Sequence, residues 1–193
     1  MRGNRPWILH DHLLKISSCI PHNGLLLEYG AGGSTRWFSA DSHRGYRVVS
    51  VEHNKTWFDK CKGLPRVDLR LFTPKQIVIH HGKTPVSLSE PMYDVITQET
   101  TLCCSEYVFQ PELADADVIF IDGVFRNTCA VVAALLAKKH AVICLHDSQD
   151  PLYEIAATAL SERCEKIFHG DSYTDNPRPD VDKRSCLTMW RKP

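Results

Sequence analysis

The fold of this chain is decided by Leu25-Leu26-Leu27-Glu28-Tyr29-Gly30-Ala31-Gly32-Gly33-Ser34-Thr35. The apolar run at its start predicts a strand that is covered on both faces, as in a parallel sheet. The glycines that follow predict a tight loop whose backbone a ligand can approach closely. Ser34 or Thr35 can cap the next helix, which we expect to end near His43, so the loop would present amide groups and a helix dipole to a ligand.

A second strand ends in an acid about twenty residues after the glycines, at Tyr46-Arg47-Val48-Val49-Ser50-Val51-Glu52. This spacing is typical of one βαβ unit that binds a nucleotide. At the tip of the second strand, Glu52 would face the glycine loop and could accept both hydroxyl hydrogens of a ribose. Two plainer interpretations stay open: Glu52 is a solvated carboxylate, and the glycines only join a strand to a helix.

The pattern Glu28-x-Gly30-x-Gly32-x-Ser34, followed by Val51-Glu52, resembles motifs I and II of class I S-adenosylmethionine-dependent methyltransferases. A dinucleotide-binding fingerprint would place its third glycine later. The resemblance implies S-adenosylmethionine as the cofactor, and no residue of the chain matches the family's adenine contact. The cofactor-binding residues that it implies are Glu28, Gly30, Ala31, Gly32, Gly33, Ser34, Thr35, Glu52, His53, Asp122 and Gly123.

The rest of the chain alternates helices and strands. Helices are predicted at 7–20, 54–61, 126–139 and 150–160, and strands at 67–72, 117–123, 140–147, 166–169 and 186–190. The helix within 1–23 would be an accessory element, and 73–116, which has no sustained periodicity, an insertion or lid. This order is similar to that of the class I methyltransferases, which implies a single α/β domain over 1–193. Its Rossmann-like, doubly wound and mostly parallel sheet would have seven strands, an antiparallel last strand and helices on both faces.

Polar side chains follow four of the predicted strands, at Glu28, Glu52-His53, Asp122 and His146-Asp147. Because ligands of open α/β sheets collect beyond the carboxyl ends of the strands, we expect these side chains to share one crevice.

Asp122, His146 and Asp147 resemble the positions at which metal-dependent O-methyltransferases hold a divalent ion, although a His-Asp pair stands here where those enzymes usually have acids or amides. Magnesium or another divalent cation bound there would lower the pKa of a substrate hydroxyl. Alternatively, His146 or Asp147 is a general base without a metal, or both residues are structural.

The string Asp122-Gly123-x-x-Arg126-x-x-Cys129-Ala130, followed by His146-Asp147 and Tyr153, also resembles uncharacterised small-molecule methyltransferase-like proteins. Arg126 stands at the start of a predicted helix. It is predicted either to hold an acidic substrate through a bidentate contact or to be solvated.

The composition is that of an ordinary globular protein, with 43% hydrophobic and 24% charged residues. The 23 basic residues balance the 23 acidic ones, so net charge does not indicate a nucleic-acid partner. The longest apolar run, 129–137, is too short to span a bilayer. The scattered cysteines form no Cys-x-x-Cys pair, which favours reduced thiols and a cytoplasmic location.

The leading hypothesis is therefore an S-adenosylmethionine-dependent methyltransferase that acts on an oxygen or nitrogen of a small molecule or saccharide. The alternatives are another nucleotide-binding Rossmann enzyme, such as an NAD-dependent oxidoreductase, and a non-catalytic binding protein with the same fold.

Overall fold

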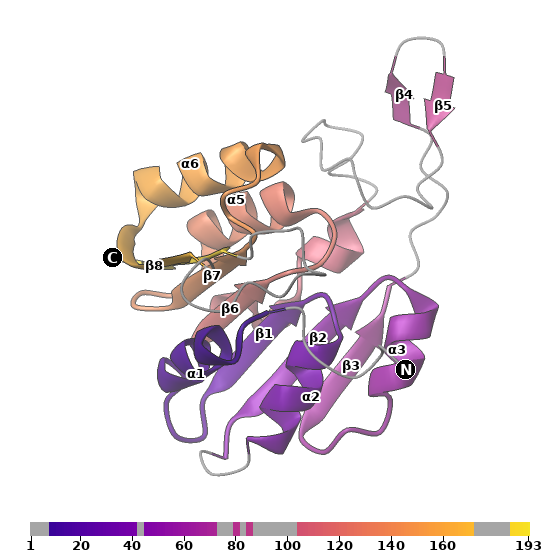
Figure 1. The fold of residues 1–193 in the computed structure, drawn as a ribbon, viewed down its shortest axis with the longest axis vertical. Coiled ribbons are helices and arrows are strands. Elements are labelled where there is room, and N and C mark those ends of the chain that lie inside the picture. The colour runs from indigo at the N-terminus through magenta and orange to yellow at the C-terminus, as the bar shows by residue number, and fades with distance from the viewer. Residues whose placement is uncertain (1–7, 42–44, 73–78, 82–83, 87–103, 172–185) are drawn as a thin grey trace.

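The computed structural model describes residues 8–41, 45–72, 79–81, 84–86, 104–171 and 186–193. A seven-stranded sheet flanked by helices makes up most of this part, and a two-stranded hairpin lies apart from it (Figure 1). In chain order the elements are α1 (His10–Ser18), β1 (Leu25–Tyr29), α2 (Gly33–Ala40), β2 (Arg47–Glu52), α3 (Lys55–Cys61), β3 (Val67–Leu71), β4 (Ile79–His81), β5 (Thr84–Val86), η2 (Pro111–Ala114), β6 (Val118–Ile121), α5 (Arg126–Leu136), β7 (Val142–His146), η3 (Pro151–Tyr153), α6 (Glu154–Arg163), β8 (Glu165–Asp171) and β9 (Cys186–Arg191).

The sheet has the strand order β3-β2-β1-β6-β7-β9-β8. Strands β3, β2, β1, β6 and β7 pair in parallel, whereas β9 runs antiparallel to both β7 and β8. The predicted fold class is confirmed, including the antiparallel last strand. After β1 the chain moves outward to β2 and β3 and then returns to the other side of β1 with β6, so the order reverses between β1 and β6. This reversal is the point where open α/β sheets bind their ligands.

The two faces of the sheet bury different side chains of the same strands, because successive residues of a strand point to opposite faces. Leu25, Leu27 and Tyr29 of β1 pack with residues of α5 and α6. Leu26 packs on the other face with residues of α1 and α2. Each of the five residues of β1 is buried, as the apolar run predicts. Figure 1 shows the two helix pairs on opposite sides of the sheet.

The predicted helix over 126–139 is too long at its C-terminal end. The helix ends at Leu136, and His140 adopts a left-handed conformation with φ of 67° before β7 begins at Val142. Leu135 and Leu136 are about half exposed, so the apolar run is not buried throughout. Composition alone did not reveal that these two leucines of the last turn are exposed.

The predicted insertion over 73–116 is described in part. It contains the antiparallel hairpin of β4 and β5, a helical turn over 104–108 and η2. The remainder of the predicted lid lies outside the described residues, as do 1–7 of the accessory region and 172–185 between β8 and β9. The helix predicted at 7–20 is present as α1 over the shorter span His10–Ser18, and its accessory role stays a prediction.

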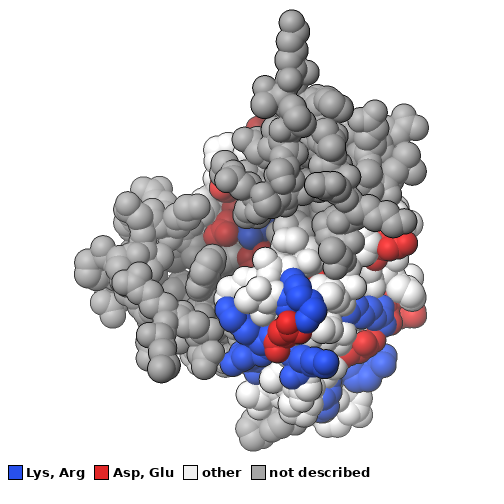
Figure 2. Space-filling view, turned by 90° about the vertical axis from the view of Figure 1, so that its right-hand side faces the viewer, with Lys and Arg blue, Asp and Glu red and all other residues white. Residues whose placement is uncertain are grey.

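Basic and acidic side chains are mixed on the side of the molecule where α3 lies (Figure 2). Lys55 pairs with Asp59, and Arg70 pairs with Asp68 and Glu112. Such pairing neutralises part of the positive charge on this surface. That the protein has no nucleic-acid partner stays a prediction. Among the described residues, no helix combines the length and apolar character needed to cross a membrane.

Candidate active site

The loops that follow β1 and β6 meet at the reversal of the strand order. Gly30 has a φ of 100°, and a Cβ added to it would lie 2.5 Å from the Gly123 Cα. Only glycine allows this approach, because any side chain would enter the opposite backbone. Gly30 also donates its amide to the Val51 carbonyl of β2 at 2.8 Å. The first glycine of the loop is therefore required by the fold itself.

Gly32 differs from Gly30, because the fold leaves space at this position. A Cβ added to Gly32 would lie no closer than 3.8 Å to its nearest neighbour, the Trp57 ring. The residue is the N-cap of α2, and its amide donates to Thr35 Oγ1 at 2.8 Å. Since packing does not demand glycine here, the partly exposed backbone at Gly32 and Gly33 is the part of the loop that a ligand can approach.

Glu28 lies beneath the loop and is completely buried. Its carboxylate accepts hydrogen bonds from Ser34 at 2.6 Å and from Thr35 and Ser50 at 2.7 Å each. Glu28, Ser34 and Thr35 are therefore brought together as supports of the loop and not as part of its open lip. Ser50 was missed by the sequence prediction, although a serine inside the buried strand Val48–Val51 is itself a signal.

Burial raises the pKa of Glu28 to about 7, against the hydrogen bonds from Ser34, Thr35 and Ser50, which lower it. Because the folded state favours the neutral acid, this group stabilises the fold below its ordinary pKa of about 4.5. The contribution is lost as the pH rises through 7. At 1.36 kcal/mol for each pKa unit, the loss in the free energy of unfolding amounts to about 3 kcal/mol.

Replacing Glu28 by glutamine is expected to remove this pH dependence, because the amide cannot ionise. Urea unfolding between pH 4.5 and 8.5 measures the free energy of unfolding of both proteins. The wild-type value should fall relative to that of Glu28→Gln as the pH rises. Glu165→Gln, at an exposed position of β8, is the control and should leave the wild-type profile unchanged. Parallel curves for wild type and Glu28→Gln would contradict the assignment.

Glu52 ends β2 and binds the glycine loop directly. One carboxylate oxygen, Oε2, accepts the Ala31 amide at 2.7 Å. The other, Oε1, accepts the amides of His53 at 2.9 Å and Asn54 at 2.6 Å. The side chain is only 4% exposed, and His53, at 28%, lies beside it. Glu52 therefore faces the loop as predicted, and Oε2 keeps one lone pair for a further donor.

Asp122, His146 and Asp147 meet where β6 and β7 end, and their ligand atoms lie within 4.8 Å of one another. His146 Nδ1 is 2.7 Å from Asp122 Oδ1 and 3.4 Å from Asp147 Oδ2. Burial would lower the pKa of His146, but the two carboxylates outweigh it and raise the pKa above its ordinary value. Burial would likewise raise the pKa of Asp122, yet the charges of His146 and Arg126 hold it below its ordinary value.

Arg126 is the cation of this cluster, so the prediction that it is solvated is wrong, whereas the contact with an acidic substrate stays a prediction. Its guanidinium lies 3.1 Å from an oxygen of Asp122 and 3.1 Å from one of Asp147. It also donates to the backbone carbonyls of Asp122, Gly123 and His146. The side chain is only 12% exposed, so it is not solvated. The sequence shows Arg126 four residues after Asp122, but it does not show that the helix turns this arginine inward.

A divalent ion fits this cluster poorly, although the three predicted ligands do come together. The Arg126 guanidinium already contacts both carboxylates, and His146 Nδ1 is engaged by Asp122. A second cation between the same carboxylates would be repelled by the first at short range. The side chains of this cluster therefore do not fit magnesium.

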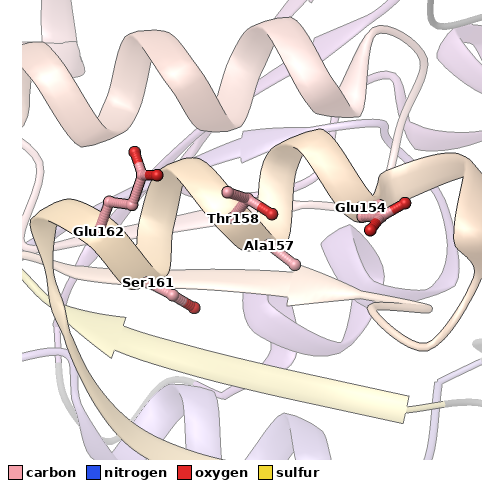
Figure 3. A pocket seen from close by; sticks show the side chains of 5 residues that line it. All are labelled: Glu154, Ala157, Thr158, Ser161 and Glu162. Carbon is pink, nitrogen blue, oxygen red and sulfur yellow. The ribbon is translucent and has the colours of Figure 1, made fainter.

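A depression of ≈ 340 Å³ lies elsewhere, on the surface of α6. Its lining residues are Glu154, Ala157, Thr158, Ser161 and Glu162 (Figure 3). All of them belong to one helix. Because sites for small ligands bury most of the ligand between several elements, this depression is not the candidate site.

No family model matches the sequence, and no curated protein resembles it significantly. Solved structures do resemble its fold. An O-methyltransferase from Thermotoga maritima that depends on S-adenosylmethionine superposes with a TM-score of 0.62 at 12% identity, covering 100% of this chain and 68% of its own. A TehB-like methyltransferase from Corynebacterium glutamicum has a TM-score of 0.56 at 12% identity, with 96% and 89% covered.

An O-methyltransferase from Bacillus cereus, solved in complex with S-adenosylhomocysteine, has a TM-score of 0.54 at 16% identity, with 96% of this chain and 82% of its own covered. These identities are low, and the likeness extends over nearly the whole chain in each case. The strand order, the antiparallel β9 and the glycine loop after β1 agree with the resemblance to class I methyltransferases that the sequence showed. The chain therefore has the fold of the class I S-adenosylmethionine-dependent methyltransferases.

Proposed function

We propose that this protein transfers a methyl group from S-adenosylmethionine to an oxygen or nitrogen nucleophile of a small molecule or saccharide. The observation that carries the proposal is the open glycine loop, held by Glu52, beside the cluster of Asp122, His146 and Asp147 at the reversal of the strand order. The binding of S-adenosylhomocysteine by the Bacillus cereus structure supports the choice of cofactor.

The cofactor is proposed to lie across the ends of β2, β1 and β6. Glu52 would accept a ribose hydroxyl through Oε2, and the backbone from Gly30 to Gly33 would line the opposite side, with His53, Asp122 and Gly123 at its ends. When bound, the sulfonium supplies an already reactive methyl group, so the chain contributes mainly the alignment of the nucleophile.

Asp147 is proposed to take the proton of the nucleophile. At 32% exposure it is more accessible than Asp122 at 23% or His146 at 4%. Its Oδ2 is held by Arg126, while Oδ1 has no hydrogen-bond partner among the residues that the structure describes. The pair of Asp122 and His146 would then orient Asp147 instead of reacting with the substrate.

Asp147→Asn is expected to lower kcat by about 10²–10⁴-fold, the usual range for loss of a general base, with S-adenosylhomocysteine affinity near normal. Methyl transfer from labelled cofactor to a panel of hydroxyl-bearing and amine-bearing small molecules and saccharides measures this. Asp150→Asn is the control, since asparagine also caps η3. We expect a chelator to have no effect. Loss of activity with a chelator, restored by magnesium, would show that a metal ion, and not Asp147 as a base, activates the nucleophile.

Ligand-induced stabilisation tests the proposed cofactor. A ligand that binds only the native state stabilises that state. S-adenosylhomocysteine should therefore raise the Tm, whereas NAD and NADP, which we expect not to bind, should leave it unchanged. Selective stabilisation by NAD would favour an oxidoreductase. Binding of S-adenosylhomocysteine without transfer to any acceptor would favour a non-catalytic protein. The predicted cytoplasmic location is a separate matter and stays a prediction.

Glu52→Ala is expected to weaken S-adenosylhomocysteine binding by about 1–3 kcal/mol, the range for losing a charged hydrogen-bond partner. Isothermal titration calorimetry measures it. Asp59→Ala removes an exposed carboxylate from the neighbouring α3 and should leave the affinity unchanged. If both variants bind as the wild type does, Glu52 only anchors the loop.

A further inference from the structure

Tyr107 places a hydroxyl group at the crossing of the two glycine loops. The residue belongs to the helical turn over 104–108, and its ring packs against Tyr29, Phe72 and Phe125 with centroid separations of 5.7, 6.1 and 5.8 Å. A Cβ added to Gly123 would collide with the Tyr107 hydroxyl oxygen and would also lie 2.8 Å from the Gly30 amide nitrogen. The phenol therefore ends where the loops after β1 and β6 touch.

The Tyr107 hydroxyl is buried and has no hydrogen-bond partner among the described residues. A buried polar group without a partner is costly, and in a native protein it calls for a specific explanation. The neighbouring Tyr29 shows the ordinary solution, because its hydroxyl donates to the Val108 carbonyl at 2.6 Å. Phenylalanine at position 107 would keep the packing and avoid the cost.

The position of this hydroxyl indicates what it binds. Glu52 ends β2, Gly30 follows β1 and Gly123 follows β6, and these three strands are neighbours in the sheet. A ligand whose ribose contacts Glu52 and which extends across β1 brings its opposite end to Gly30 and Gly123. In S-adenosylmethionine that end is the amino-acid part, which carries a carboxylate.

The geometry points to Tyr107 as a binding residue that donates a hydrogen bond to the carboxylate at the amino-acid end of the cofactor, an inference that rests on the proposed function. Burial raises the pKa of Tyr107 well above its ordinary value, so the phenol keeps its proton as a donor. Because the hydroxyl is buried, the segment from Gly123 to Phe125 would have to shift for the carboxylate to reach it. Phe125 has a φ of 56°, a left-handed conformation that is strained for a non-glycine residue and common at ligand sites.

Tyr107→Phe tests this inference against two ligands. S-adenosylhomocysteine contains the amino-acid part, whereas 5′-methylthioadenosine has the nucleoside and the sulfur without it. By calorimetry, the Kd for S-adenosylhomocysteine should rise roughly 10- to 100-fold, the range for a hydrogen bond to a charged group. The Kd for 5′-methylthioadenosine should not change, and the Tm of the ligand-free variant should equal or exceed that of the wild type.

Tyr29→Phe is the matched control, because it removes a neighbouring hydroxyl that already has a partner. It should lower the Tm of the ligand-free protein and leave the affinity for S-adenosylhomocysteine unchanged. Unchanged S-adenosylhomocysteine affinity in Tyr107→Phe would overturn the inference while the proposed function stands. Equal weakening of both ligands would also overturn it, since packing alone would then be the cause. A wild-type protein that does not bind S-adenosylhomocysteine would remove the proposed function and this inference together.

Discussion

Gly32→Val is expected to abolish the thermal stabilisation by S-adenosylhomocysteine and to leave the fold intact. The valine side chain has room in the ligand-free protein, because the nearest atom to an added Cβ is a Trp57 ring carbon at 3.8 Å. The same side chain would fill the space through which the cofactor approaches the loop backbone. A thermal-shift titration, together with far-UV circular dichroism of the variant, measures both parts of the expectation.

Ala40→Val is the control for Gly32→Val, since it adds comparable bulk at an exposed position of the same helix, α2. It should respond to S-adenosylhomocysteine as the wild type does. A normal shift in Gly32→Val would mean that the cofactor does not pass this loop, and the proposed binding mode would be withdrawn. An unfolded variant would contradict the space that the structure shows around Gly32.

Arg126→Met is expected to lower the free energy of unfolding by about 3–5 kcal/mol, the range for removing one partner from a buried ion pair. Methionine keeps an unbranched apolar stem but leaves Asp122 and Asp147 without their cation and three backbone carbonyls without a donor. Urea unfolding at pH 7 measures the loss.

Lys138→Met is the control for Arg126→Met, because Lys138 also pairs with an aspartate, Asp117, but is 38% exposed. Removal of an exposed pair should cost no more than about 1 kcal/mol. Equal losses in the two variants would show that the Arg126 cluster is no stronger than a surface pair. A rise in the Tm of the wild-type protein with manganese would show that a metal, and not Arg126, is the cation that the carboxylates prefer.

The architecture was predictable because its signals are local. An apolar run between turn residues specifies a covered strand, and the alternation of such strands with helices restricts the topology to a few choices. The helix predicted to start at residue 54 is a further case, because the Asn54 side chain caps α3 by accepting the amides of Thr56 and Trp57. The C-terminal end of α5 was less predictable, because an exposed leucine such as Leu136 looks the same in sequence as a buried one.

The set of residues at the strand ends was also predictable, since parallel strands bring their carboxyl ends to one edge. Asp122, His146 and Asp147 do meet there. The ion pairs that these carboxylates form were not predictable, because Arg126 was expected to face a substrate or solvent. Its true partner Asp147 lies 21 residues away in the chain, and only the packing of α5 against the sheet brings the two together.

By itself, the sequence determined the strands, the glycine loop and the edge of the sheet at which polar groups gather, because periodicity and turn chemistry act between near neighbours in the chain. Only the tertiary structure decided which of these groups a ligand can reach. Glu28 and Glu52 look alike in sequence, each an acid near the end of an apolar run. Glu28 is closed off by hydroxyls that include Ser50, 22 residues away, whereas Glu52 faces the loop. The physical reason is that burial and hydrogen-bond partners depend on distances in space, and the fold sets those distances between residues that are far apart in the chain.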